Sequence, residues 1–252
     1  MKNFFINKKL KSNYDEYYKD GEFEWREIGA NNKVKNIVHL CQVISHEKII
    51  DIGSGEGAVL NGLSDIEFAK ELYSLEISVS GIEVIKKRKI PNLMECKLFD
   101  GYHIPYKDKE FDLAILSHVI EHVEYPRALV KEAGRVARYV FMEVPLELNA
   151  RLPLNYKWNK VGHINFYSLK TIRYLLQTTN FEIIDQRISN SSYASYRYSF
   201  RSKAVLRYLL KEIILQCGPR LATELFTYNC AILASLRNNV SENSINLHIR
   251  CP

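Results

Sequence analysis

The sequence has few cysteines, and none of them stand in pairs. The five cysteines among its 252 residues are scattered, with no Cys-x-x-Cys spacing. This argues against a disulfide framework or zinc ligands, and we expect reduced thiols. The first nine residues contain an apolar run of three residues, Phe4–Ile6. That run is too short for a signal-peptide core or a membrane span, so we expect a cytoplasmic protein.

A strong charge imbalance is also lacking. The net charge is +6, with 25% charged and 46% hydrophobic residues. This mild basic excess does not by itself predict a nucleic-acid-binding protein, and no nucleic-acid partner is expected. Obvious repeats and low-complexity tracts are absent as well. The composition is typical of an ordinary globular protein, and we expect one domain with additions at its edge.

What the sequence does contain is a glycine-rich turn after a short apolar segment. Lys48–Ile52 is rich in isoleucine, as is typical of a buried parallel strand. Gly53, Gly55 and Gly57 follow, and their missing side chains let the backbone turn tightly and a ligand come close. Ala58 then begins a helix whose first amides face the turn. The pattern predicts a cofactor site, although three glycines alone also fit an ordinary strand-to-helix turn.

Two acids follow at the ends of predicted strands. Glu76 lies 25 residues after Asp51 (76 − 51), close to the spacing at which an acid accepts hydrogen bonds from ribose hydroxyls in dinucleotide-like sites. Asp100 ends the third predicted strand, at the sheet edge where ligands of open α/β folds bind. There it can accept a hydrogen bond from an adenine amino group. The alternative for Glu76 is a surface acid at a strand end.

Strand and helix patterns alternate regularly along the middle of the chain. The predicted strands are residues 48–52, 71–77, 96–99, 111–117 and 139–145, with helical segments between most of them. This alternation predicts βαβ units, a parallel sheet and right-handed crossovers.

These residues resemble the class I S-adenosylmethionine-dependent methyltransferases, in particular the ubiquinone-biosynthesis-type and related small-molecule enzymes. The resemblance covers roughly residues 45–185, and the order of its blocks makes it specific. Its spacing G-x-G-x-G also differs from the G-x-G-x-x-G of nicotinamide dehydrogenases. The blocks are Asp51-Ile52-Gly53-Ser54-Gly55-Glu56-Gly57, Glu76, Asp100 with Ile104-Pro105-Tyr106, and Phe111-Asp112-Leu113-Ala114-Ile115-Leu116-Ser117-His118-Val119-Ile120-Glu121-His122-Val123.

The resemblance implies an α/β, Rossmann-like fold with a seven-stranded sheet of order 3-2-1-4-5-7-6, its last strand antiparallel and its faces flanked by helices. Residues 181–185 supply strand six and residues 228–236 supply strand seven, with a helical insertion at about 189–227 between them. The implied cofactor is S-adenosyl-L-methionine. The residues implied around it are Asp51, Gly53, Ser54, Gly55, Gly57, Glu76, Ile77, Asp100, Gly101, Ser117 and His118.

Candidate catalytic residues follow from the chemistry of methyl transfer. The reaction is an in-line displacement, so the protein mainly aligns the reacting atoms. A hydroxyl acceptor gains from a general base, and histidine suits neutral pH. His118 follows the fourth strand, and His163 stands in a Gly-His loop like those that close over the acceptor pocket in related enzymes. His163 can instead fix its loop through a backbone hydrogen bond, and His122 is expected to be structural.

The acceptor side is less well marked in the sequence. Tyr156 and Trp158, in the loop after the fifth strand, can line an acceptor pocket with His163, or can pack on the sheet edge. Glu143 and Glu147 can bind an amine or a cationic sugar, or can be solvated. Along the sequence no His, Asp and Glu residues cluster with metal-ligand spacing, so no metal is predicted.

The predicted organisation has three parts. Residues 1–44 form an N-terminal helical arm or cap, residues 45–240 form the methyltransferase domain, and residues 241–252 form a flexible tail. Within the insertion, residues 201–215 show a helix with one apolar side and several basic residues. This helix can pack on its own domain, cover the substrate, form a dimer contact or lie on a membrane surface.

The sequence therefore predicts a methyltransferase that acts on a small molecule, at a hydroxyl of a sugar, a natural product, or a quinone or lipid precursor. N-methylation, C-methylation and a catalytically silent cofactor-binding module are the alternatives. A nucleic-acid methyltransferase would want an Asn/Asp-Pro-Pro-Tyr/Phe segment where this chain has Ser117-His118-Val119-Ile120.

Overall fold

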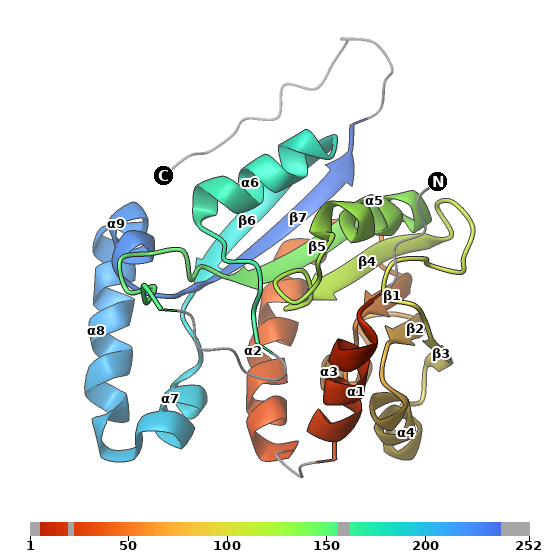
Figure 1. Ribbon diagram of the computed structural model, residues 1–252, viewed down its shortest axis with the longest axis horizontal. Helices are drawn as coiled ribbons and strands as arrows, with labels where there is room; N and C mark the ends of the chain where they lie inside the picture. The colour runs from red at the N-terminus through yellow and green to blue at the C-terminus, as the bar shows by residue number, and fades with distance from the viewer. Residues whose placement is uncertain (1–5, 20–22, 156–161, 238–252) are drawn as a thin grey trace.

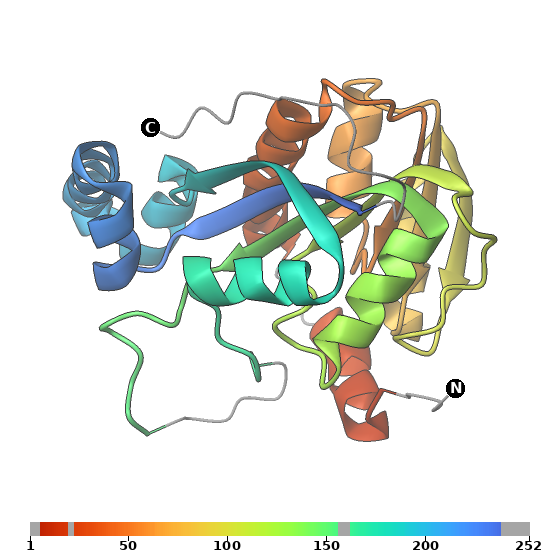
Figure 2. The same ribbon diagram turned by 90° about the horizontal axis from the view of Figure 1, so that it is seen from above.

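A seven-stranded sheet forms the middle layer of the structure, with helices on both faces (Figures 1 and 2). The computed structural model describes residues 6–19, 23–155 and 162–237. The strand order is β3-β2-β1-β4-β5-β7-β6, and β7 is antiparallel to both of its neighbours. The predicted Rossmann-like order and direction are confirmed. The strands are β1 (Lys48–Ile52), β2 (Glu71–Glu76), β3 (Leu93–Leu98), β4 (Phe111–Ser117), β5 (Ala137–Pro145), β6 (Phe181–Ser189) and β7 (Asn229–Leu236).

Side-chain alternation along the strands explains the two layers of helices. In β1, Ile49 packs with the helices of one face, whereas Ile50 and Ile52 pack with those of the other. Helices α2 and α3 cover the first face, and α5 and α6 cover the second. The helices are α1 (Lys8–Tyr17), α2 (Phe23–Cys41), α3 (Ala58–Asp65), α4 (Val79–Arg88), α5 (Pro126–Val136), α6 (Leu169–Thr178), α7 (Tyr193–Phe200), α8 (Ala204–Cys217) and α9 (Pro219–Leu225).

Local signals set the ends of several of these helices. Pro126 begins α5 at a position where its missing N–H is not needed. Ser168 caps α6 through a reciprocal capping box with Thr171. Gly218 ends α8, as its position before Pro219 predicts.

The insertion between β6 and β7 consists of α7, a short 3-10 turn at Arg201–Lys203, α8 and α9. Its main helix, α8, leaves its apolar side exposed: Leu206 is 74% exposed, and Ala204 is its one buried residue. The alternative in which this side packs on its own domain is therefore wrong. A dimer or membrane-surface contact through residues 201–215 stays a prediction. None of the described helices combines the length and apolar character that crossing a membrane requires.

Two helical glycines make a matched pair for testing how tightly the layers pack. A Cβ on Gly134 of α5 would collide with the fully buried Phe181 ring, whereas a Cβ on Gly29 of α2 meets nothing within 4 Å. We expect Gly134→Ala to lower the free energy of unfolding by about 1–3 kcal/mol through overpacking. Gly29→Ala should raise it by up to ~1 kcal/mol through helix propensity. Urea unfolding measures both, and equal effects of the two changes would contradict this packing.

Candidate functional site

The glycine turn between β1 and α3 is fastened to the neighbouring strand β2. Gly53, Gly55 and Gly57 all have positive φ angles (75°, 60° and 79°), which other residues rarely adopt. The Gly53 amide donates to the Leu75 carbonyl at 2.7 Å, and the Gly55 amide donates to Glu76 Oε2 at 2.7 Å. The turn therefore presents bare backbone beside the carboxylate that ends β2.

Two buried acids lie at this sheet edge, Asp51 and Glu76. Burial raises the pKa of Asp51 to about 7, with a further rise from the nearby Glu76 charge and an opposing effect of Lys33. Burial also raises the pKa of Glu76 to about 7, although the amides of Ser78 and Gly55 partly offset it. Both groups are poised to ionise fully when a ligand supplies hydrogen-bond donors or positive charge.

A cavity of about 510 Å³ opens in front of this edge. Most of the residues predicted for the site line it, whereas Gly57 and Asp100 do not. Asp100 Oδ1 instead accepts from the amides of Tyr102 and His103, at 2.9 and 2.7 Å. Tyr156 and Trp158 lie outside the described residues. The predicted residues that line the cavity are Asp51, Gly53, Ser54, Gly55, Glu76, Ile77, Gly101, Ser117, His118 and His163.

Helix α1, which lies in front of the β1 and β2 end of the sheet in Figure 1, supplies Tyr14 and Tyr17 to the wall of the cavity. Asp15 Oδ1 accepts from the Val79 amide at 2.6 Å, which ties α1 to the start of α4. The Tyr18 hydroxyl lies over the glycine turn, 2.8 Å from where a Cβ on Gly55 would stand. Tyr14 stacks on Tyr18 with ring centroids 6.0 Å apart. These contacts support the prediction that the N-terminal segment caps the site.

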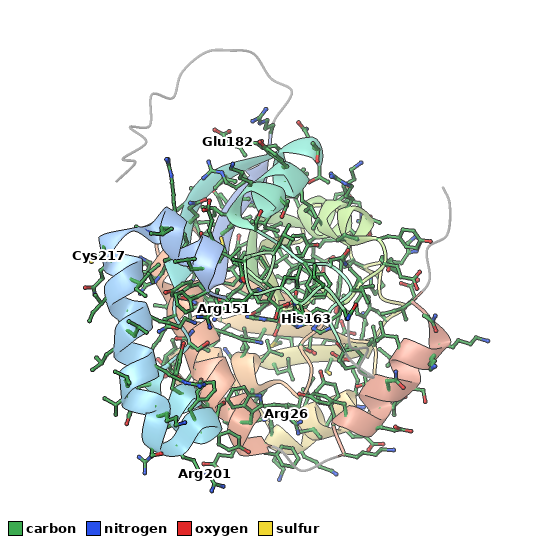
Figure 3. The ribbon with its side chains drawn as sticks, turned by 60° about the vertical axis from the view of Figure 1, so that its left-hand side comes forward. Arg26, Arg151, His163, Glu182, Arg201 and Cys217 are labelled. Atoms are coloured by element: carbon green, nitrogen blue, oxygen red, sulfur yellow. The ribbon has the colours of Figure 1, made fainter. Side chains whose placement is uncertain are left out.

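Helix α2 contributes residues that the sequence analysis missed. Arg26, labelled in Figure 3, forms an ion pair with the buried Glu56 at 2.8 Å. Lys33 also lines the cavity, and between the two lie Gly29 and Ala30. Positions 26, 29, 30 and 33 share one face of a helix. The sequence did contain a signal for this face: two basic residues share it with small residues, whereas a helix face that packs on the core is ordinarily apolar.

His118 sits between two buried carboxylates at the end of β4. Its Nδ1 lies 3.1 Å from Glu121 Oε1 and its Nε2 lies 3.2 Å from Glu143 Oε1, while Asn36 donates to Glu143 Oε2 at 2.9 Å. Burial and the Lys33 charge lower the pKa of His118, but the two carboxylates outweigh them and raise it. His118 also has a φ of +57°, a strained conformation typical of functional sites. This arrangement suits a charged, positioning group better than a proton acceptor.

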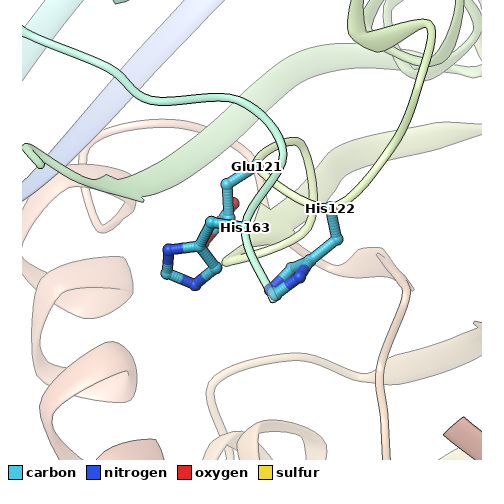
Figure 4. Close-up of side chains that lie close together, drawn as sticks. All are labelled: Glu121, His122 and His163. Carbon is cyan, nitrogen blue, oxygen red and sulfur yellow. The ribbon is translucent and has the colours of Figure 1, made fainter. Parts of the chain in front are cut away.

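His163 and His122 meet on the acceptor side of the cavity. His163 Nδ1 lies 2.5 Å from Glu147 Oε2, and the two imidazole rings pack edge to face with centroids 4.7 Å apart. Burial lowers the pKa of His163, but Glu147 outweighs this effect and raises it. Burial lowers the pKa of His122 to about 4. Figure 4 shows both rings beside Glu121. His122 was expected to be structural, and the structure places it in the lining of the cavity as well.

Comparison with known proteins decides what this site belongs to. A family model described as a methyltransferase domain matches residues 25–186. The chain belongs to this methyltransferase family. The match includes the glycine turn, both buried acids and the Glu121-His122 segment, and the methyl donor is S-adenosylmethionine.

Individual relatives of the methyltransferase are distant. A demethylmenaquinone methyltransferase of Thermotoga maritima is 28% identical over 137 residues, 54% of this chain and 57% of that protein, so the chain spans little more than half the relative's length. Coclaurine N-methyltransferase bound to N-methylheliamine and S-adenosylhomocysteine superposes with a TM-score of 0.62 at 12% identity, over 92% of this chain and 84% of that one. Magnesium protoporphyrin IX methyltransferase of Synechocystis gives 0.53 at 14% identity, over 84% of each. At these identities the two structures show the fold alone.

The residues of the cavity fit the methyl donor chemically. S-adenosylmethionine carries an ammonium, a ribose diol and an apolar adenine. The cavity offers the carboxylates of Asp51 and Glu76, open backbone at Gly55, and apolar walls from Ile77 and Phe99. We propose that Glu76 accepts from the ribose and that Asp51 attracts the ammonium end.

Binding of S-adenosylhomocysteine should weaken as the pH falls from 8 to 6. With pKa values of about 7, Asp51 and Glu76 are mostly ionised at pH 8 and mostly protonated at pH 6. Only the ionised forms accept from both ribose hydroxyls or attract an ammonium. The requirement for one ionised group raises Kd by about tenfold over this range, which isothermal titration measures. Glu76→Gln should bind more weakly at pH 8 and show a shallower profile, and an unchanged profile would contradict the role of Glu76.

Release of α1 should also weaken donor binding. Asp15→Ala removes the acceptor for the Val79 amide and loosens α1 over the cavity. We expect Kd for S-adenosylhomocysteine to rise by about three- to tenfold, because a hydrogen bond to a charged group contributes roughly 1.5 kcal/mol or somewhat less when exposed. Asp65→Ala, on the exposed end of α3, is the matched control. In stopped-flow measurements we expect S-adenosylhomocysteine to dissociate faster from Asp15→Ala than from the wild type or Asp65→Ala. Equal dissociation rates in all three proteins would exclude a capping role.

Proposed function

We propose that this methyltransferase transfers the methyl group of S-adenosylmethionine to a hydroxyl of a small-molecule acceptor. The observation that carries the proposal is the His163–Glu147 pair, whose histidine lines the same cavity as the glycine turn. A carboxylate that holds the imidazole by Nδ1 fixes its orientation and tautomer, as in catalytic His-carboxylate pairs. His163 is therefore the group that activates the acceptor.

The need for such a group favours oxygen as the methylated atom. The sulfonium is already an activated donor, and a neutral amine attacks it without losing a proton first. A hydroxyl is a weak nucleophile at neutral pH and gains most from a group that handles its proton. His163, with Glu147 behind it, supplies this activation.

The size and cover of the cavity support a small acceptor. About 510 Å³ falls in the range of small-molecule sites, roughly 300–1,000 Å³. Tyr14 and Tyr17 of α1 form part of its wall, which favours a small acceptor over a nucleic-acid strand. Sugars, natural products, and quinone or lipid precursors all carry suitable hydroxyls. The names of the relatives, which refer to menaquinone and porphyrin chemistry, support this class.

N-methylation is the second candidate, and one observation favours it. Glu143 is buried and its side chain lines the cavity, so its carboxylate can bind the ammonium group of an amine acceptor. The similarity of the fold to coclaurine N-methyltransferase is consistent with this alternative. Mass spectrometry of the labelled product separates an O-methyl from an N-methyl group.

Loss of His163 should abolish methyl transfer without loss of donor binding. With labelled S-adenosylmethionine and a pool of small hydroxyl compounds extracted from cells, His163→Ala should lower turnover by about 10²–10⁴-fold. Its Kd for S-adenosylhomocysteine should stay within about threefold, because the donor half lies around Gly55 and Glu76. His103→Ala, an exposed histidine, is the matched control. Full turnover by His163→Ala, or a methyl group found only on nitrogen, would overturn the proposal.

A further inference from the structure

Three potential metal ligands gather at the acceptor end of the cavity (Figure 4). One ligand-type atom each from Glu121, His122 and His163 lies within 4.8 Å of the others. They come from two loops that backbone bonds hold together, because the amides of Ile164 and Asn165 both donate to the Glu121 carbonyl, at 2.8 and 3.0 Å. His163 stands 41 residues after His122 (163 − 122), which is why spacing along the sequence did not reveal the cluster.

The Glu121 carboxylate has an incomplete set of hydrogen-bond partners. It is fully buried, and among the described residues neither of its oxygens receives a hydrogen bond. The His118 ring lies 3.1 Å from one oxygen and supplies a positive charge on that side. Buried carboxylate oxygens without donors are costly and rare in native proteins. The carboxylate therefore points to a cation that belongs beside it.

Both histidines are oriented as metal ligands are. His122 Nδ1 contacts the Gly162 carbonyl at 3.4 Å, and His163 Nδ1 contacts the Glu147 carboxylate at 2.5 Å. Because these partners can only accept, each Nδ1 carries a proton, and the lone pair of each ring resides on Nε2. Metal-binding histidines typically donate their other ring N–H to a carbonyl or a carboxylate in this way.

We propose that Glu121, His122 and His163 bind a divalent cation of the zinc, manganese or cobalt class. Two imidazoles and one carboxylate suit such borderline ions. Bonds of about 2.1 Å place tetrahedral ligand atoms roughly 3.4 Å apart, so side-chain movements of about 1 Å close the site. Three protein ligands leave further positions open. Since His122 and His163 line the cavity, those positions face the acceptor.

The cation deepens the proposed function and rests on it, because it explains how His163 acts. A hydroxyl bound to the cation has a lowered pKa and releases its proton to solvent water. The resulting alkoxide oxygen forms a bond to the methyl carbon while the carbon–sulfur bond breaks. The electron pair of that bond returns to sulfur, giving neutral S-adenosylhomocysteine. His163 thereby activates the acceptor as a ligand of the cation.

Cobalt titration tests the site without any acceptor. The untagged full-length chain is stripped with EDTA, dialysed and titrated with Co²⁺, and its visible absorption bands report bound cation. We expect one equivalent to bind to the wild type and Zn²⁺ to displace it. Glu121→Gln and His163→Asn should each weaken binding by more than about tenfold, and Glu147→Gln by about tenfold through its contact with His163. His103→Asn is the matched control and should bind as the wild type does.

The outcomes separate the cation from the proposed function. The site is supported if the wild type binds one equivalent of Co²⁺ and Glu121→Gln and His163→Asn do not, provided that thermal unfolding shows both variants to be folded. This result holds even if no hydroxyl acceptor is found. Binding of less than one equivalent, or binding that these variants retain, overturns it. Methyl transfer that resists EDTA but fails in His163→Ala also overturns the cation and leaves O-methylation intact, with His163 as a direct base.

Discussion

The hydrogen bond from the Gly55 amide to the Glu76 carboxylate is the constraint on which the donor half of the site depends. It joins a turn built on three glycines to the end of the neighbouring strand, with 2.7 Å between the Gly55 nitrogen and Glu76 Oε2. Only glycine tolerates this path, because φ is positive at Gly53, Gly55 and Gly57. The close fit continues on the far side, where a Cβ on Gly81 would stand 2.6 Å from the Gly55 carbonyl oxygen. Backbone and strand ends therefore shape this half of the cavity.

The acceptor half is built differently, from buried charges that run between helix α2 and the loops. Asn36 bonds to Glu143, Glu143 faces His118, and His118 faces Glu121. Each group would be costly to bury alone, and together they hold one another in place. Because this series of contacts begins at Asn36 on α2 and ends at Glu121, helix α2 is part of the acceptor half of the site.

This difference explains how much the sequence could predict. The βαβ units, the glycine turn and Glu76 follow from local patterns, since strand alternation and glycine spacing act within a few residues, whereas the order of the strands came from the resemblance to a known family. The His122–His163 pair and the role of Glu121 could not follow, because hydrogen bonds from Ile164 and Asn165 bring distant loops together. The sequence could not predict that the apolar side of α8 is exposed either, since amphipathic spacing does not show what the apolar side packs against.

The charges around the acceptor end help to explain why methyl transfer takes place in a cavity. With His118 protonated, its charge and that of Lys33 face the carboxylates of Glu121 and Glu143. The positive charge of the sulfonium is lost when methyl transfer leaves the sulfur neutral. In the proposed transfer to a hydroxyl, the charges of an alkoxide and a sulfonium cancel as the methyl moves, so surroundings that solvate ions poorly lower the barrier. Tyr14 and Tyr17 of α1 line this cavity, and the hydrogen bond between Asp15 and the start of α4 holds the helix beside it.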